Sequence, residues 1–341
     1  MNFVKESIFL NALRSFFVAL FGSIGAFFGF FFVIMLCIFL ISSSEDKKKL
    51  PSKLTILPDA EGNRKELSVS SPVILQISIE GVIGSDPITA EKIEEILLDS
   101  REEAFHNDRV KGILLVIDSP GGGVNDSDII YRLIKAYKSV YKIPVYAYVN
   151  GMCASGGYYI ACAADKIYAS PVSIIGSIGV ISWPPYFNAV EAMKKIGVSA
   201  LTLSAGQGKD SLNPTRPWTA DEGVHRQALL DFFYKDFVSL VTQNRPKITE
   251  EDLVKIYGAE VFPAPDALLK GYIDAVVDLK RDALTALVQT ADIHEPYQVV
   301  CFKTKSWWKE LFQERALPVI KHEFSLPSEM SLEPCRFQYR P

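Results

Sequence analysis

A long uncharged stretch near the N-terminus constrains this chain more than any other feature. No Asp, Glu, Lys or Arg occurs between Arg14 and Glu45, and residues 16–41 form a run of 26 residues dominated by Phe, Ile, Val and Leu. A helix needs about 20 apolar residues to cross a bilayer core. A cleaved signal peptide has a shorter apolar region, of about 7–15 residues, that ends at a small-x-small site. We therefore predict an uncleaved transmembrane helix over residues 16–41, preceded by a flank over residues 1–15.

The charges beside this helix do not decide which side of the membrane carries the rest of the chain. Lys5 and Arg14 precede the helix, and four lysines follow it between residues 47 and 53. Applied to these counts, the positive-inside rule would leave the C-terminal part in the cytoplasm. Long domains translocate largely regardless of such counts, so the orientation stays open at this point.

Composition excludes several classes of protein. The chain has 341 residues, with 36 Lys+Arg against 40 Asp+Glu and a net charge of −4. This balance leaves no basic excess to neutralise phosphates, so nucleic acid is not an expected partner. Hydrophobic residues make up 48% of the chain, which is enough for a sizeable core. Five cysteines in a chain of this length do not form a disulfide scaffold.

Beyond the predicted helix, a polar segment leads into an alternating pattern. Residues 42–71 carry prolines, glycine and mixed charges, and we predict a linker there. Buried-strand runs follow at residues 73–79, 112–117 and 145–149, with predicted helices capped by Thr89, by Asn125 or Asp126, and starting near Ser155. Strands that alternate with helices predict an α/β domain with mainly parallel pairing.

The later part of the chain is more helical. Thr219 and Glu222 form a capping box ahead of an amphipathic pattern, and Thr249 is placed to cap a shorter helix. Residues 291–341 show no clean periodicity. We place the folded domain at residues 72–290 and treat residues 291–341 as a C-terminal extension of unknown role.

Two glycine-rich turns each follow a buried strand directly. They are IDSPGGG, residues 117–123, and NGMCASGGYY, residues 150–159. Glycines in such positions let backbone N–H groups turn toward an anion without interference from a Cβ atom, and a following helix adds its positive end. The oxyanion formed during acyl transfer needs donors of this kind. Ordinary tight turns are the alternative interpretation.

Ser155 is the candidate nucleophile beside these donors. Its small neighbours Ala154 and Gly156 leave the hydroxyl accessible, although a serine at the start of a helix is also an ordinary N-cap. Cys153 is the rival nucleophile. A thiolate needs an activating partner, none is evident nearby, and a free cysteine commonly serves as a small buried hydrophobic residue.

A serine nucleophile needs a base, and the sequence offers a lysine. The four histidines have no local motif that ties them to Ser155, although a Ser-His-Asp triad is not excluded by sequence. A lysine amine, with an ordinary pKa near 10.4, must be shielded from water and carboxylates to act as a base. Lys209 follows Gly208 in a loop, but Asp210 would keep it charged if the two side chains faced each other. Taken alone, Lys209 has the character of a surface lysine.

Several long segments, in order, resemble the SppA family of signal peptide peptidases, also called protease IV. The similarity runs from about Ile113 to Val277 and is carried by DSPGGGV, PVYAYVNGMCASGGYYIACAAD, IIGSIGVI, GKDSLNPTRPWTADE and GYIDAV. The chain resembles the short bacterial form, with one catalytic domain. The resemblance implies a ClpP/crotonase-like α/β fold, with parallel sheets and flanking helices, preceded by one transmembrane helix.

The resemblance also implies roles for particular residues. Ser155 matches the family's nucleophile, Lys209 its general base, and Ser177 the serine that orients the lysine amine. Backbone N–H groups of Gly121 or Gly122, together with that of Gly156, match the oxyanion hole. No metal or cofactor is implied.

The family further implies substrates, a partner and a location. The expected substrates are hydrophobic peptides, notably the remnants of cleaved signal peptides, degraded in or at the membrane. The expected location is the bacterial cytoplasmic (inner) membrane, single-pass, with the catalytic domain on the extracytoplasmic side. The expected partner is the chain itself, in a homo-oligomeric ring where the lysine of one subunit can complete the site of its neighbour.

The sequence departs from the family at two places, and two other functions stay open. Cys153 replaces a common alanine, which raises the question of oxidation sensitivity, and Gly208 replaces a frequent aromatic residue, which thins the wall around Lys209. A crotonase-type acyl-CoA enzyme also uses paired glycine turns but needs no serine nucleophile. A catalytically silent membrane scaffold is the other alternative; a solvated Lys209 would favour it.

Overall fold

A computed structural model describes residues 13–22, 25, 29–30, 53–68, 70–102, 105–106 and 108–303. The chain divides into two compact units, Met1–Pro51 and Ser52–Pro341. The described residues of the first unit are helical. The predicted transmembrane helix over residues 16–41 falls largely outside the described residues. Within the described part of the chain, no helix combines the length and the apolar character needed to span a bilayer.

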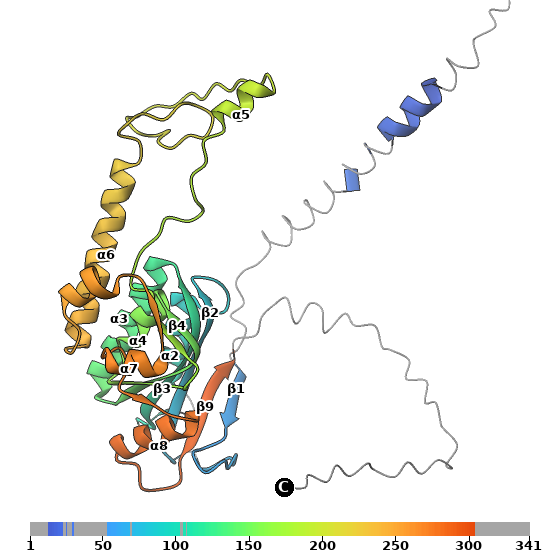
Figure 1. The fold of residues 1–341 in the computed structure, drawn as a ribbon. Helices are drawn as coiled ribbons and strands as arrows, with labels where there is room; N and C mark the ends of the chain where they lie inside the picture. The colour runs from blue at the N-terminus through green and yellow to red at the C-terminus, as the bar shows by residue number, and fades with distance from the viewer. Residues whose placement is uncertain are drawn as a thin grey trace, which may run out of the picture. The chain divides into compact units, whose positions relative to one another are not determined.

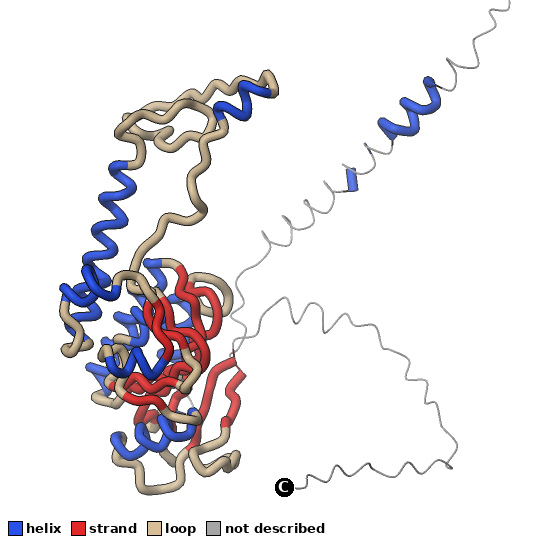
Figure 2. Tube along the Cα trace, in the orientation of Figure 1, coloured by secondary structure: helices blue, strands red, loops and turns tan. Residues whose placement is uncertain are grey.

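The described part of the second unit is built on one nine-stranded sheet (Figures 1 and 2). Across the sheet the strands follow the order β1 (Lys53–Leu57), β9 (Gln298–Lys303), β2 (Val73–Ile83), β3 (Val110–Gly122), β4 (Val145–Ala154), β5 (Lys166–Ala169) and β8 (Ala275–Val276). Two short strands, β6 (Ile174–Gly176) and β7 (Val261–Pro263), continue from the end of β4. The pairings from β9 through β8 are parallel, and β1–β9 and β6–β7 are antiparallel.

The described helices of the second unit are α2 (Ala90–Asp99), α3 (Val124–Tyr141), α4 (Gly156–Ala161), α5 (Val190–Lys195), α6 (Val224–Asn244), the π-helical η2 (Asp252–Tyr257), α7 (Ala264–Leu269) and α8 (Lys280–Thr290). Apart from α5, they contribute buried side chains to the two apolar layers that cover the sheet. Along β3, Ile113, Leu115 and Ile117 belong to the larger core, whereas Leu114 and Val116 pack with α8 on the opposite face. Because strand side chains alternate between faces, a strand buried on both faces is continuously apolar, as the sequence showed. The predicted mainly parallel α/β fold is confirmed.

The predicted helix caps were partly right. Thr89 caps α2 by accepting the Lys92 N–H at 3.4 Å. Neither Asn125 nor Asp126 caps α3, because α3 already begins at Val124. Asp126 instead accepts the Ala90 N–H at 2.9 Å, so its carboxylate serves the start of α2.

The sheet is wider than the sequence predicted. β1 lies within the predicted linker over residues 42–71, and β9 lies within the predicted extension over residues 291–341. The two strands pair antiparallel with Lys53 opposite Lys303, and β9 also pairs with β2. Both strands are too short to show a clear alternation of apolar and polar residues. They are stabilised by pairing with each other, which connects the two ends of the domain.

Residues 182–223, here called the arm, leave the sheet after β6 and return through α6. Figure 1 shows α5 and its neighbouring loops beyond the end of α6 that is farther from the sheet. α5 has no buried residue. The most exposed apolar side chains of the arm are those of Trp183, Ile196, Leu201 and Leu203. The arm therefore has little core of its own in a single chain.

Candidate active site

The two glycine-rich turns lie side by side at the carboxyl ends of β3 and β4. Ser119 of the first turn is paired with Cys153 of the second. The Asp118 carboxylate accepts the Met152 N–H at 2.8 Å and ties the turns together. Parallel strands end at the same edge of a sheet, which is where ligands bind in α/β folds. The adjacency needed for a shared oxyanion site is therefore present.

Ser155 occupies a strained turn between β4 and α4. Its backbone has φ 52° and ψ −122°, a conformation that costs a residue other than glycine about 1–3 kcal/mol. The Ser155 N–H donates to the Gly176 carbonyl at 2.9 Å, and the Ser155 carbonyl accepts the Tyr159 N–H at 3.0 Å. These bonds hold the strained conformation. A strand–turn–helix of this kind presents a nucleophile at the end of a strand.

Two glycines let the turns approach each other. A Cβ atom on Gly121, which has φ +104°, would lie 2.7 Å from the Cβ atom of Ser155. A Cβ atom on Gly156 would collide with the Ser127 hydroxyl oxygen. Side chains at these positions would push Ser155 away from the first turn.

The N–H groups of the first turn point in different directions. Gly121 donates to the Ser119 hydroxyl at 3.1 Å, and Gly123 donates to the Ile83 carbonyl at 2.9 Å. The Gly122 nitrogen lies 3.4 Å from where a Cβ atom of Gly156 would stand, and the Gly156 nitrogen lies 3.0 Å from where a Cβ atom of Gly121 would stand. Both glycines are thus close to Gly156, but the Gly121 N–H is already donated to Ser119, which makes Gly122 the better candidate to share a ligand with Gly156.

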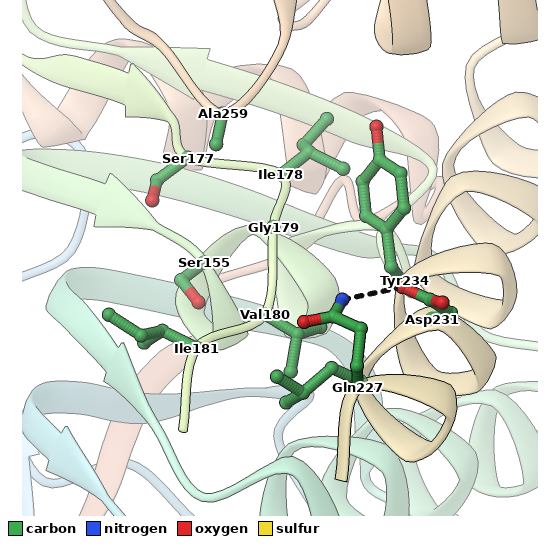
Figure 3. Close-up of a pocket in the computed structure, with 11 residues that line it drawn as sticks. Ser155, Ser177, Ile178, Gly179, Val180, Ile181, Gln227, Asp231, Tyr234 and Ala259 are labelled. Atoms are coloured by element: carbon green, nitrogen blue, oxygen red, sulfur yellow. Dashed lines mark hydrogen bonds between the residues drawn. The ribbon is translucent and has the colours of Figure 1, made fainter. Parts of the chain in front are cut away.

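Ser177 lies next to Ser155 because β6 pairs with β4. The register sets Gly176 opposite Ala154, so the residues that follow them are neighbours. The Ser177 N–H donates to the Glu260 carbonyl at 2.8 Å, which fixes the turn after β6. Both serines line one pocket of about 450 Å³ (Figure 3). The other residues that line this pocket are Ile178, Gly179, Val180, Ile181, Gln227, Leu230, Asp231, Tyr234 and Ala259.

A second, mainly apolar pocket also includes Ser155. It is lined by Gly122, Val124, Ser127, Gly156, Tyr159, Gly179, Val180, Phe233, Asp236 and Phe237. The Tyr159 hydroxyl is 3.0 Å from carboxylate oxygens of both Asp128 and Asp236. Burial, followed by these two carboxylates, raises the pKa of Tyr159, so its hydroxyl stays protonated and donates. This second pocket is small, about 30 Å³, and lies on the α4 and α6 side of Ser155.

Lys209 lies elsewhere in the chain. It is an exposed residue of the arm, in a cavity lined by residues 202–205 and 209–214. Neither pocket that contains Ser155 includes Lys209. The neighbouring carboxylate of Asp210 pairs with Arg216, whose Nε is 2.8 Å from Asp210 Oδ2. A single chain thus brings together Ser155, Ser177 and the glycine turns, but not Lys209.

Comparison with known proteins places this chain in a family. The profile of peptidase family S49 matches residues 138–294, and the profile of Clp protease matches residues 84–175. A putative protease of Synechocystis sp. is 34% identical over 201 residues, which cover 59% of this chain and 68% of that protein. The chain belongs to peptidase family S49. The predicted resemblance to the SppA family and the ClpP-like fold are confirmed.

Two further relatives match over smaller shares of their length. A putative protease of Methanocaldococcus jannaschii is 38% identical over 200 residues, 59% of this chain and 61% of that protein. A putative signal peptide peptidase SppA of Enterococcus faecium is 29% identical over 227 residues, 65% of this chain and 64% of that protein. The chain therefore spans less than two thirds of the length of each of these two relatives.

The rival nucleophile of this S49 domain is inaccessible. Cys153 is fully buried, and burial raises the pKa of its thiol well above the usual range. A thiol that is neither exposed nor ionised is a poor nucleophile and is protected from oxidation. Cys153 therefore belongs to the core, as the alternative interpretation held, and the concern about oxidation has no structural support.

Sequence reasoning missed the contribution of α6 to the S49 site. Only the apolar pattern of this helix was recognised, yet Gln227, Asp231 and Tyr234 line the pocket that holds Ser155 and Ser177 (Figure 3). Their i, i+4, i+7 spacing marks one helix face and could have identified them. None of the described histidines lines a pocket that contains Ser155.

Proposed function

We propose that this S49 protein is a serine endopeptidase in which Ser155 is the nucleophile and Lys209 the general base. The observation that supports it most is the geometry of Ser155, held at positive φ at the end of β4 beside two glycine turns. Ser155 Oγ attacks the peptide carbonyl carbon while a neutral Lys209 amine takes its proton. The amine then protonates the leaving nitrogen, and water hydrolyses the acyl-enzyme.

The N–H groups of Gly122 and Gly156 are the proposed oxyanion donors. The bond from Gly121 to Ser119 makes Gly121 the weaker choice of the two residues in the first turn. Removing one such donor typically costs about 2.7–4 kcal/mol of transition-state stabilisation. Ser177, in the same pocket as Ser155, is the proposed partner of the lysine amine.

The base is proposed to come from another copy of the chain. Lys209 is exposed and lines a different cavity from Ser155, so the dyad needs a second subunit. The apolar side chains of the arm, such as Leu201 and Leu203, are more than four-fifths exposed, and a homo-oligomeric ring would cover them. The pocket that holds Ser155 and Ser177 is large enough to receive a lysine side chain.

The proposed substrates are hydrophobic peptides, including the remnants of cleaved signal peptides. Apolar residues lie beside Ser155, among them Val124, Val180, Phe233 and Phe237, and apolar surroundings of this kind favour an apolar peptide. One relative is named a putative signal peptide peptidase. The apolar run over residues 16–41 supports a single-pass anchor in the cytoplasmic membrane, with the domain proposed to face outward.

Mixing two inactive variants tests this proposal. Ser155→Ala and Lys209→Ala should each abolish cleavage of an apolar peptide by the full chain. In mixed oligomers, a Ser155→Ala subunit still supplies Lys209 to the Ser155 of a Lys209→Ala neighbour, so about a quarter to a half of the activity should return. Ser182→Ala, another change in the arm, is the matched control.

The same experiment decides between the peptidase and a silent scaffold. The exposed position of Lys209 in one chain is the specific observation that favours a scaffold. Full activity of Lys209→Ala would rule out the dyad. Wild-type chains that never cleave a peptide, and never react at Ser155 with an acylating inhibitor, would support the scaffold.

A further inference from the structure

Arg216 joins two carboxylates beside Lys209. Its Nε donates to Asp210 Oδ2 at 2.8 Å, and Nη1 donates to Glu222 Oε2 and to the Pro217 carbonyl, both at 3.0 Å. Nη2 donates to the Asp210 carbonyl and to Glu222 Oε1, also both at 3.0 Å. All five N–H donors of the guanidinium therefore have an acceptor.

These contacts hold a loop that has little apolar core. The Glu222 side chain is only 6% exposed, although most residues around it in the arm are open to solvent. Its carboxylate also accepts the Leu212 N–H and both the N–H and the hydroxyl of Thr219. Arg216 and Glu222 thus close residues 210–222 into a loop, and Lys209 lies directly before this loop.

We infer that Arg216 is a positioning residue for the base: it holds the Asp210 carboxylate away from the Lys209 amine, so that the amine can lose its proton. This inference rests on the proposed function, because it concerns the same lysine.

Lys209 needs the Asp210 carboxylate to be held by Arg216, because a nearby free carboxylate would keep the lysine amine protonated. A carboxylate within about 4–6 Å stabilises the protonated form of an amine by about 1–3 pKa units. Among the described residues that line its cavity, Asp210 is the only other charged one. In the proposed assembly the amine would also meet Asp231 of the Ser155 pocket, which accepts the Gln227 side-chain N–H at 2.8 Å.

The pKa values of the loop carboxylates are shifted in the direction that this arrangement requires. Hydrogen bonding to Arg216 is the main cause that lowers the pKa of Asp210 below its usual range. The same guanidinium, followed by the Leu212 N–H, lowers the pKa of Glu222 to about 2. Both carboxylates are therefore ionised at the pH where a peptidase works, and an unpaired Asp210 would be a strong partner for Lys209.

Changes at Arg216 and Asp210 in the full chain test the inference. In Arg216→Gln, the acidic limb of kcat/KM against pH for an apolar peptide should move up by about one pH unit. Activity at neutral pH should then fall about tenfold and recover at alkaline pH. Adding Asp210→Asn to Arg216→Gln should move the limb back. Lys194→Gln is the control, because it removes an arm cation that pairs with Glu191 at 2.7 Å; its profile should match wild type.

Other outcomes have distinct meanings. If Arg216→Gln lowers kcat/KM equally at every pH, and Asp210→Asn recovers nothing, Arg216 supports only the shape of the loop and the inference is wrong. If Lys209→Ala, measured in the same series, cleaves as well as wild type, the proposed function itself fails.

Discussion

At the scale of single residues, the site depends on glycines, because a Cβ atom at their positions would collide with neighbouring atoms. Gly156 combines a proposed N–H donor with a position where a Cβ atom would strike the Ser127 hydroxyl oxygen. The hydrogen bonds to Gly176 and Tyr159 hold the strained backbone of Ser155.

A methyl group at Gly156 should therefore cost activity more than stability. We expect Gly156→Ala to lower kcat about a hundredfold, because the N–H group shifts away from the oxyanion. Steady-state kinetics and a thermal melt check this. Gly123→Ala is the matched control, since Gly123 has φ −62° and a Cβ atom there meets nothing closer than 3.7 Å. An equal loss in both variants would contradict the prediction.

The burial of Cys153 predicts how its thiol behaves in the folded protein. Because burial raises its pKa, the thiol stays protonated at neutral and mildly alkaline pH. We expect maleimide to leave Cys153 unmodified in native protein and to modify it after unfolding, as measured by peptide mass spectrometry. Rapid native labelling would mean that the turn opens.

The sequence predicted residues that the structure does bring together at this scale. Ser155 and the glycine turns were predicted from motifs directly after strands, and Ser177 from the resemblance to the SppA family; their roles stay predictions. The separation of Lys209 from Ser155 was not predicted. A sequence motif shows which residues are adjacent along the chain, but it does not show where a projecting loop lies relative to the rest of the fold. The contacts of Arg216 were equally hidden, since they depend on the fold of the loop.

At the scale of elements, the ion pair between Arg216 and Glu222 explains why a helix begins later in the arm than the sequence predicted. Thr219 and Glu222 predicted a helix start, and Glu222 does accept the Thr219 N–H, but α6 begins only at Val224. The Glu222 carboxylate is shared with Arg216 and Leu212, so the loop closes before the helix begins. The sequence did predict β2, β3 and α3, whose longer apolar patterns are not overridden by polar contacts of this kind.

The loop closed by Glu222 should open in acid before the domain unfolds. Its folded pKa of about 2 lies below the ordinary carboxylate value, so its contribution is present above about pH 4.5 and is lost as the pH falls toward 2. We expect hydrogen exchange over residues 210–222 to accelerate in this range while β3 stays protected. Glu222→Gln should already exchange fast at pH 6. Unchanged protection of the wild-type loop down to pH 2 would contradict this.

At the scale of the whole molecule, the exposed arm predicts self-association. Leu201 is 85% exposed in the single chain and does not line the Lys209 cavity, and a neighbouring subunit would cover it. We expect Leu201→Glu to lower the oligomeric mass measured by light scattering and to reduce cleavage at least tenfold, although Ser155 and Lys209 are unchanged. Val172→Glu is the control, because Val172 is 85% exposed outside the arm. Full activity of a monomeric Leu201→Glu protein would refute a base supplied by a neighbour.

The predictions from sequence were least complete at this scale. The α/β fold followed from strands that are apolar on both faces, but the outer strands β1 and β9 escaped notice because each gains its stability from a partner over 200 residues away. The predicted anchor over residues 16–41 and the ring stay predictions.

The place of β9 between β1 and β2 joins the two ends of the domain in one seam. β1, at the N-terminal end of the second unit, is held in the sheet by its pairing with β9. Truncation before Gln298 would leave β1 without that neighbour. Proteolytic trimming at this point would then release β1 from the sheet while leaving the turn at Ser155 in place.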